Sequence, residues 1–422
     1  MLRVGKILVL SLLVTSLCAS LAFATTSRVI ALGGTSRYIN DDSDIFRWYG
    51  TLPSYSKMVF VEAGTAMGSG GSLDVGYQAL GLTHNWGEDH WLGTWSIYLL
   101  QNTIEDPSFF LFNPLGTPGL FDPTLSMPST KFAFGWGKQL SSIALGVNFN
   151  RSDGSIEASG GEKINYTFLS IGGAVRWDIN EDMYGDAAFT YGTAGGDMID
   201  PEGAPDQAAG WDKKTSFDIE ARLFWEFLDD VTMVPYFGYS TADFSLEGIP
   251  ASSGTKATAL ALGAALNFDV NTNNLLIFAI DFENYNLKPS KAASGDQSEA
   301  KATVLPKFTL ALESDITSWF TARVGATKTM TKFVLKDADG AEGTITDAEW
   351  ALGLFDTETF MMPNIEANDF QWYLGGGFHV GEWDIDAVFS HELPFRLGYW
   401  LTGYGVDNEE PPVGRVSATY RF

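Results

Sequence analysis

The feature that most constrains this fold is a two-residue alternation of apolar and polar side chains over unusually long segments. Between Ser216 and Phe227, six apolar side chains alternate with a mostly charged set over twelve residues. The same alternation recurs at residues 276–283, 304–313 and 383–390. Successive side chains of a strand point to opposite faces, and about 9–11 tilted residues cross a bilayer. The pattern therefore predicts membrane-spanning strands with one apolar face and one polar face.

Short turn signals join the predicted strands on one side, and longer loops join them on the other. The longer links lie at 103–128, 194–210, 289–299 and 336–366, and seven tight turns lie at 85–90, 138–141, 178–182, 228–230, 269–273, 314–318 and 380–382. Seven turns pair fourteen strands, and one strand at each end brings the total to about sixteen, within a range of 14–18. This layout is typical of an all-β, antiparallel transmembrane barrel.

Tryptophan lies beside six of the seven tight turns, at Trp86, Trp91, Trp136, Trp177, Trp225, Trp319 and Trp383. Indole prefers a membrane interface because its ring is apolar while its N–H needs a partner. The alternative is core tryptophan in a large soluble sandwich or propeller, which would not gather at one class of turn. The distribution favours a membrane barrel.

The first 24 residues have the organisation of a secretory signal peptide, with Arg3 and Lys6 ahead of an apolar run and Ala22-Phe23-Ala24 at the cleavage site. Cys18 is the only cysteine, so we expect no disulfide and no thiolate metal site after cleavage. The chain carries 52 acidic and 26 basic side chains, which argues against a nucleic-acid partner. The expected organisation is a leader at 1–24, a plug-like segment at 25–56 and a barrel at 57–422.

The chain ends with Val416, Ala418, Tyr420 and Phe422 on one face and phenylalanine as the last residue. This resembles the C-terminal signature of bacterial outer-membrane barrels. The resemblance implies a Gram-negative outer membrane, contact with bilayer lipid and lipopolysaccharide, and recognition by the barrel assembly machinery. Residues 28–64 are similar in layout to fatty-acid-transporter-like barrels, in which a segment before the first strand folds into the lumen. This chain has Trp48-Tyr49-Gly50 where those proteins usually carry Asn-Pro-Ala.

The polar face of each predicted strand would line the lumen. The alternation also places Gln78 inward, and the principal lumen-lining candidates are Asp186, Asp218, Glu220, Arg222, Glu226, Asp281, Glu283, Lys307, Arg323, Asp384 and Asp386. Carboxylates outnumber cations in this set, so a water-filled lumen would attract cations. Alternatively, these groups pair with one another inside a blocked barrel. The sequence leaves both interpretations open.

The stretch NDDSDIFRWYG, at residues 40–50, precedes the first strand and lacks the two-residue period. Irregular backbone is not tolerated in contact with lipid, so we expect this stretch in the lumen or the periplasm. Asp42 or Ser43 can cap a short helix. The plug candidates are Asp41, Asp42, Asp44, Phe46, Arg47 and Trp48. A structural plug is the main interpretation, and gating and metal binding are the alternatives.

Two loops and four histidines complete the functional survey. The loop at 103–128 is rich in Phe, Leu and Pro, so it either docks a hydrophobic substrate, packs inward or contacts another protein. The loop at 336–366 is acidic, but its Asp337-Ala338-Asp339-Gly340 start lacks the remaining ligands of a calcium loop. Ser390 and His391 point to opposite faces of a strand, so they cannot form a catalytic pair within it. We expect no enzymatic activity, no cofactor and no metal.

The sequence thus predicts an outer-membrane, porin-like channel for passive passage of small solutes, including hydrophobic or amphipathic ones, through an electronegative lumen. The alternative function is a non-conducting structural or assembly barrel that anchors surface partners through its acidic extracellular loops.

Overall fold

A computed structural model describes residues 26–65, 76–86, 91–101, 131–157, 163–199, 210–243, 255–271, 273–289, 299–336, 342–345, 368–389 and 413–422. The leader at 1–24, the apolar loop at 103–128, most of the acidic loop at 336–366 and the pair Ser390 and His391 lie outside these residues.

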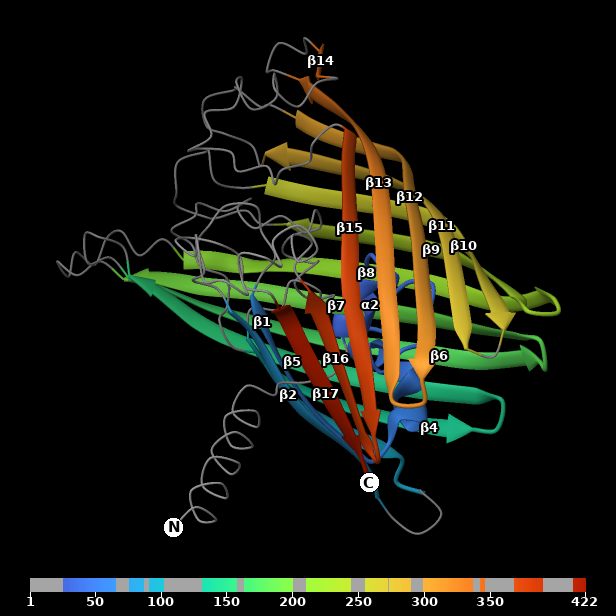
Figure 1. Cartoon of the computed structure of the whole chain (residues 1–422). Helices are drawn as coiled ribbons and strands as arrows, with labels where there is room; N and C mark the ends of the chain where they lie inside the picture. The colour runs from blue at the N-terminus through green and yellow to red at the C-terminus, as the bar shows by residue number, and fades with distance from the viewer. Residues whose placement is uncertain are drawn as a thin grey trace, which may run out of the picture.

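The described strands close into an antiparallel barrel (Figure 1). They are β1 (Met58–Thr65), β2 (Gly76–Asn85), β3 (Thr94–Gln101), β4 (Lys131–Leu140), β5 (Ile143–Glu157), β6 (Lys163–Asn180), β7 (Met183–Ile199), β8 (Gly210–Leu228), β9 (Val231–Asp243), β10 (Thr255–Asn271), β11 (Asn274–Pro289), β12 (Glu299–Thr317), β13 (Phe320–Lys336), β14 (Glu342–Ile345), β15 (Asn368–Val380), β16 (Trp383–Phe389) and β17 (Val413–Arg421). Apart from β14, each strand pairs with its neighbour along the chain, and β1 pairs with β17 to close the ring. Among the described strands β14 pairs only with β13, whose remaining length pairs with β15, so sixteen strands form the wall. The predicted fold class and strand number are confirmed.

Tight hairpins join the strands at one end of the barrel, and six of them lie at or within three residues of predicted turns. The seventh predicted turn, at 85–90, lies between β2 and β3, and its residues 87–90 are outside the described part of the chain. Several of these turns need a backbone in the left-handed region, supplied by Ser141 (φ 56), Asp230 (φ 64) and Gly381 (φ 63). Trp86, Trp319 and other tryptophans are exposed close to this end. In outer-membrane barrels the short turns face the periplasm, so we call this end periplasmic.

The two faces of the wall separate by chemistry. On β8, Asp218, Glu220 and Arg222 are buried toward the lumen, whereas Ile219 and Trp225 are 41% and 39% exposed on the outside. The outer faces of the other strands expose the same kind of side chain, including Leu80, Leu82, Ile97, Leu99, Leu145, Val147, Phe149, Ile171, Phe237, Leu262, Phe278, Ile280, Leu310, Leu312 and Val324. An apolar surface of this extent is unfavourable in water, and lipid is its natural solvent.

One lumen assignment is wrong. Gln78 is exposed on the same face of β2 as Leu80 and Leu82, while Ala79 is buried toward the lumen. The inward positions of β2 hold small residues, so the polar residue beside them gave a misleading sign of the inner face. Gln78 lies near the loop-side end of β2, where a polar side chain is tolerated outside the apolar band.

Residues 26–56, here called the lumenal segment, lie inside the barrel (Figure 1). The segment forms α2 (Thr26–Ala31), η1 (Asp42–Phe46) and η2 (Tyr49–Tyr55). Helix α2 contacts β13, β15 and β16, whereas η2 contacts β4, β5 and β6 on the far side of the ring. None of the helices formed by the described residues is long and apolar enough to span a membrane.

Small inward residues make room for this segment. A β carbon at Gly146 or Gly172 would overlap Tyr49, and one at Gly375 would overlap Ala31. Two apolar clusters complete the fit, one around Leu32, Tyr38 and Trp48 and a second in which Ile45 and Leu52 pack on β1 to β4.

Candidate functional site

The lumenal segment turns across the lumen through a capped 3-10 helix. Asp41 has extended backbone (φ −147, ψ 157), its carboxylate accepts a hydrogen bond from the Ser43 N–H at 3.0 Å, and Asp44 accepts one from the Asp41 N–H at 3.4 Å. The predicted cap at Asp42 or Ser43 is therefore one or two residues too late. A capping box needs an acceptor three residues into the helix, and Asp44 fulfils that role for Asp41.

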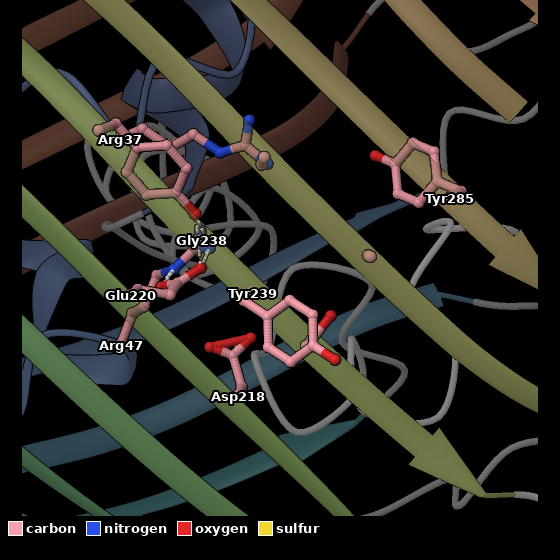
Figure 2. A pocket seen from close by; sticks show the side chains of 11 residues that line it. Arg37, Arg47, Asp218, Glu220, Gly238, Tyr239 and Tyr285 are labelled. Atoms are coloured by element: carbon pink, nitrogen blue, oxygen red, sulfur yellow. Dashed lines mark hydrogen bonds and ion pairs between the residues drawn. The ribbon is translucent and has the colours of Figure 1, made fainter.

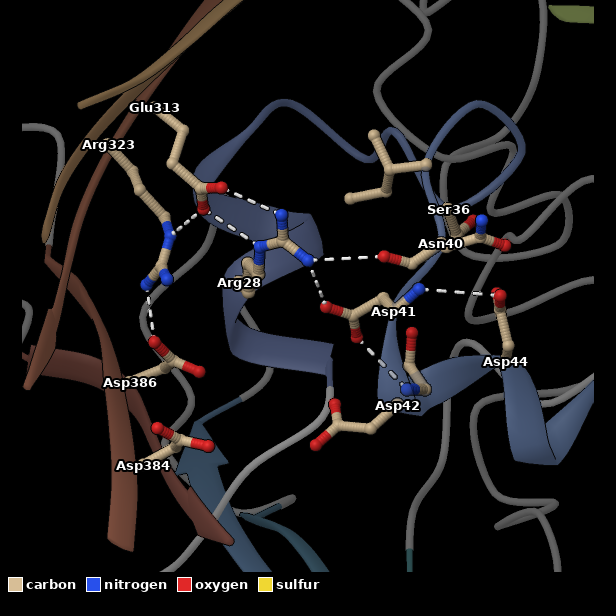
Figure 3. Close-up of polar contacts among 12 residues, drawn as sticks. Arg28, Ser36, Asn40, Asp41, Asp42, Asp44, Glu313, Arg323, Asp384 and Asp386 are labelled. Carbon is tan, nitrogen blue, oxygen red and sulfur yellow. Dashed lines mark hydrogen bonds and ion pairs between the residues drawn. The ribbon is translucent and has the colours of Figure 1, made fainter. Parts of the chain in front are cut away.

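An arginine of α2 fastens the start of the segment to the wall (Figure 3). Arg28 donates to both carboxylate oxygens of Glu313 on β12, at 2.8 and 2.7 Å, and to Asp41 at 2.9 Å. Arg323 on β13 donates to the same Glu313 at 2.5 Å and to Asp386 on β16. Bidentate pairs between Arg and carboxylate are among the stronger and more directional contacts in proteins. This chain of charges connects the segment to three strands.

Arg222 on β8 fixes the middle of the segment. Its side chain is fully buried and donates to Asp44 at 2.6 Å, to Asp186 at 2.9 Å and to the carbonyl oxygens of Ser36 and Ile39 at 3.0 Å each. Its guanidinium also lies 4.5 Å from the ring centroid of Trp48, a cation–π geometry. One wall arginine thus binds the segment at four places.

Two further arginines of the segment bind wall carboxylates on β8 and β11. Arg37 donates to Glu283 at 2.6 Å and to Asp281 at 3.4 Å. Arg47 donates to both carboxylate oxygens of Glu220 from its Nε and Nη2 atoms, and Nη2 also donates to the Tyr236 hydroxyl at 3.1 Å. In the docked state these wall carboxylates are neutralised by the segment.

The structure brings most of the predicted lumen and plug residues into this network. Asp186, Asp218, Glu220, Arg222, Asp281, Glu283, Arg323 and Asp386 are buried, and Lys307 is half-buried. Asp384 lies closer to the periplasmic rim, where it binds Arg421 and, at 2.7 Å, His379. Glu226 is exposed beside the tight turn that follows β8. The plug candidates lie in or next to η1, where Phe46 packs edge-on against Phe60 at 5.4 Å.

Sequence reasoning did not single out Arg28 and Arg37. With Arg47 they are the only cations of residues 26–56, and they precede a barrel with an excess of inward carboxylates. That imbalance was the available signal. The acidic run at 41–44 has arginine partners, and in the described part of the chain no group of three or more His, Cys, Asp or Glu side chains is placed to hold a metal ion.

Docking of the segment is coupled to the protonation of Asp44. Burial raises the pKa of Asp44 to about 6, against the opposing effect of the Arg222 charge and hydrogen bond. An unfolded aspartate titrates near pH 3.9, so folding takes up a proton between these values, and stability falls as the pH rises through 6. We expect the protein to be more stable at pH 5 than at pH 7 by on the order of 1 kcal/mol relative to Asp44→Asn. Urea unfolding of both proteins at the two pH values measures this, and parallel shifts in wild type and variant would contradict it.

No protein-family model and no curated protein sequence matches this chain. Solved structures give remote similarities. CdiB from Escherichia coli is 10% identical with a TM-score of 0.43, and the match covers 86% of this chain and 62% of CdiB. A Pseudomonas aeruginosa FadL homologue is 13% identical with a TM-score of 0.42, covering 95% of this chain and 99% of that one. The CymD monoaromatic hydrocarbon channel is 11% identical with a TM-score of 0.39, again covering 95% and 99%.

The barrel's own geometry gives the class. Among the described strands, pairing of β1 with β17 closes the ring, as strands that cross a bilayer require. Its outer face is apolar, its lumen is charged, and tryptophans ring the end with the tight turns. The chain is therefore an outer-membrane β-barrel protein whose lumen is crossed by its own N-terminal segment.

Proposed function

We propose that this protein is an outer-membrane channel for small solutes and that the lumenal segment is its plug. The observation that carries the proposal is the way the segment is held. Arginine–carboxylate pairs bind the segment to strands around the ring, and inward glycines let it lie close to the wall. Because these contacts are made by side chains and by close packing, the segment can leave as a unit without breaking any strand pairing. Water can solvate every charged group that its departure exposes.

The size and lining of the barrel support passage once the plug moves. Barrels of sixteen to eighteen strands are wide enough for an aqueous channel, whereas eight-stranded barrels are filled by side chains. At the level of the plug, the inward positions hold charged, amide, hydroxyl and small residues, among them Asn148, Asn150, Ser170, Thr190 and Ser240. Such a lining suits hydrated solutes.

Plug movement also changes the charge of the lumen. Arg28, Arg37 and Arg47 leave with the segment, and the wall carboxylates that they neutralised, including Glu220 and Glu283, remain. The face formed by β8, β11 and β12 then becomes electronegative. We therefore infer that the open channel selects cations, because departure of the segment removes the arginines that neutralise the wall carboxylates.

An apolar region of the wall suits amphipathic solutes as well. Phe60, Tyr98 and Leu100 point into the lumen on β1 and β3, where Phe46 and Ile45 of the segment cover them. Release of the segment would leave an apolar strip beside a charged face. A solute with one apolar and one charged end fits that combination.

Planar-bilayer recording of the full-length protein and of a variant lacking residues 26–56 tests the proposal. We expect the deletion to raise the open fraction and to give a reversal potential that favours K⁺ over Cl⁻. Absence of current steps in both proteins would contradict a channel and favour the non-conducting anchor. A deletion variant that conducts without cation preference would contradict only the charge argument.

A further inference from the structure

A pocket lies between the lumenal segment and the wall formed by β8, β9, β10 and β11 (Figure 2). Its cavity volume is about 20 Å³, room for a group the size of a water molecule or an ammonium head. It is lined by Arg37 and Arg47 from the segment and by Asp218, Glu220, Tyr236 and Tyr285 from the wall. Ala259 and Ala261 on β10 line it with small side chains. The pocket is therefore built partly from the segment and partly from the barrel.

Asp218 is the exceptional group in this pocket. It is 6% exposed, and among the described residues its carboxylate has neither a hydrogen-bond donor nor an ion-pair partner. Figure 2 draws no hydrogen bond or ion pair to this carboxylate, while Glu220, two residues further along β8, is bonded to Arg47. A buried charge without a partner is costly. The carboxylate is thus placed to receive a cation.

The other charges around the pocket are matched. Glu220 binds Arg47, Arg37 binds Glu283 and Asp281, and Lys307 lies opposite Asp281 across the β11–β12 pairing. Arg37, Arg47 and Lys307 thus balance the charges of three carboxylates, namely Glu220, Asp281 and Glu283. The fourth carboxylate, Asp218, has no such partner in the described part of the chain.

The remaining lining suits an organic cation more than a bare metal ion. The ring of Tyr285 on β11 lies at the pocket, and an aromatic ring attracts an alkylammonium group while shielding its carbon atoms from water. A hard inorganic cation requires about six oxygen ligands, and no described group of three or more His, Cys, Asp or Glu side chains supplies such a cluster. Asp218 is the one unpaired carboxylate of the described lining, and with the Tyr285 ring and two alanines beside it, it matches the ammonium head of a small organic cation.

We infer that this pocket is a binding site for a small organic cation, an amine-bearing solute whose ammonium group pairs with Asp218. This inference rests on the proposed channel function, because it names the solute class that the site would take.

The position of the site also links binding to opening. An ammonium group beside Asp218 lies next to Glu220, the partner of Arg47, and therefore competes with the segment for a wall carboxylate. Solute binding weakens the attachment of the lumenal segment at this point. Amine solutes are therefore expected to raise the open fraction of the channel.

Calorimetric titration of the full-length protein in detergent with n-butylammonium tests the site. The neutral isostere n-butanol, the anion butyrate and K⁺ are the matched probes. We expect butylammonium to bind and Asp218→Asn to weaken binding by roughly 10- to 100-fold, the value of one hydrogen bond between ionised groups. Ala259→Leu, which fills the pocket without changing its charge, should also weaken binding. Asp153→Asn, an exposed carboxylate on β5 paired with Arg151 at 2.7 Å, should leave it unchanged.

Several results would overturn the site. These are no butylammonium binding to wild type, equal binding of butanol, competition by K⁺ at equal concentration, or unchanged binding in Asp218→Asn. Conductance separates this inference from the channel proposal. Current steps without amine binding would support the channel proposal and contradict the binding site. Amine binding without current would support the binding site and contradict the channel proposal.

Discussion

Replacing Gly146 with valine should expel η2 from the barrel wall while leaving the strands paired. A β carbon at this inward position of β5 would overlap the backbone carbonyl of Tyr49, and neither atom belongs to a flexible side chain. Overpacking of a core costs about 1–3 kcal/mol where side chains can adjust. Because only backbone is available to move here, we expect at least about 3 kcal/mol against docking. Valine itself favours a strand, so the barrel should still form.

Cysteine labelling measures this release. Thr51 lies in η2 and is 0% exposed, so Thr51→Cys in a Cys18→Ser background should resist a maleimide reagent. Adding Gly146→Val should speed labelling about 100-fold, the factor that corresponds to about 3 kcal/mol. The control is Gly173→Val on the neighbouring strand, where a β carbon would meet nothing closer than 4.0 Å. Equal protection of Thr51→Cys in both glycine variants would contradict the close fit.

Replacing Arg222 with methionine should destabilise the protein by about 3–5 kcal/mol, the usual cost of removing one partner from a buried ion pair. Asp186 keeps its contacts with Arg176 at 2.7 and 2.8 Å, but Asp44 loses its guanidinium partner. The carbonyl oxygens of Ser36 and Ile39 also lose a donor. The loss therefore falls mainly on the lumenal segment.

Urea unfolding in lipid vesicles, followed by tryptophan fluorescence, measures this effect. Arg151→Met is the matched control, because Arg151 and Asp153 form a pair whose side chains are 56% and 52% exposed. Exposed pairs contribute about 0–1 kcal/mol, so this variant should differ little from wild type. Asp44→Asn should recover part of the loss in the Arg222→Met background. Similar losses in Arg222→Met and Arg151→Met would show that the buried network does not stabilise the protein.

The barrel could be predicted from sequence because the alternation of apolar and polar residues within each strand shows which face meets lipid and which faces the lumen. The alternation from Phe217 to Phe227 needs only local sequence, and the tight turns and tryptophans lie where a membrane barrel requires them. Gln78 shows the limit of this reasoning. Where inward positions are Ala, Gly and Thr, the polar residue of a strand no longer marks the lumen.

The arrangement of the site was less accessible. The sequence left open whether inward carboxylates face water or partners, and the partners proved to lie far away in the chain, as with Arg28 and Glu313, 285 positions apart. Inward glycines such as Gly146 are neither polar nor apolar in the alternation, so the position at which Tyr49 packs on the wall could not be predicted from the sequence. That Asp218 lacks a partner among the described residues of the pocket depends on the positions of every neighbouring charge.

The most direct test of the plug is to lock it in place. The β carbon of Leu52 lies 2.9 Å from the position of a β carbon at Gly137. A disulfide requires about 3.8 Å, so a shift of about 1 Å allows one to form between Leu52→Cys and Gly137→Cys in a Cys18→Ser background. Single-channel recording of the oxidised protein should show no current steps, and reductant should restore them to the level of the two single-cysteine variants. Equal currents before and after reduction would contradict the claim that movement of the lumenal segment opens the barrel.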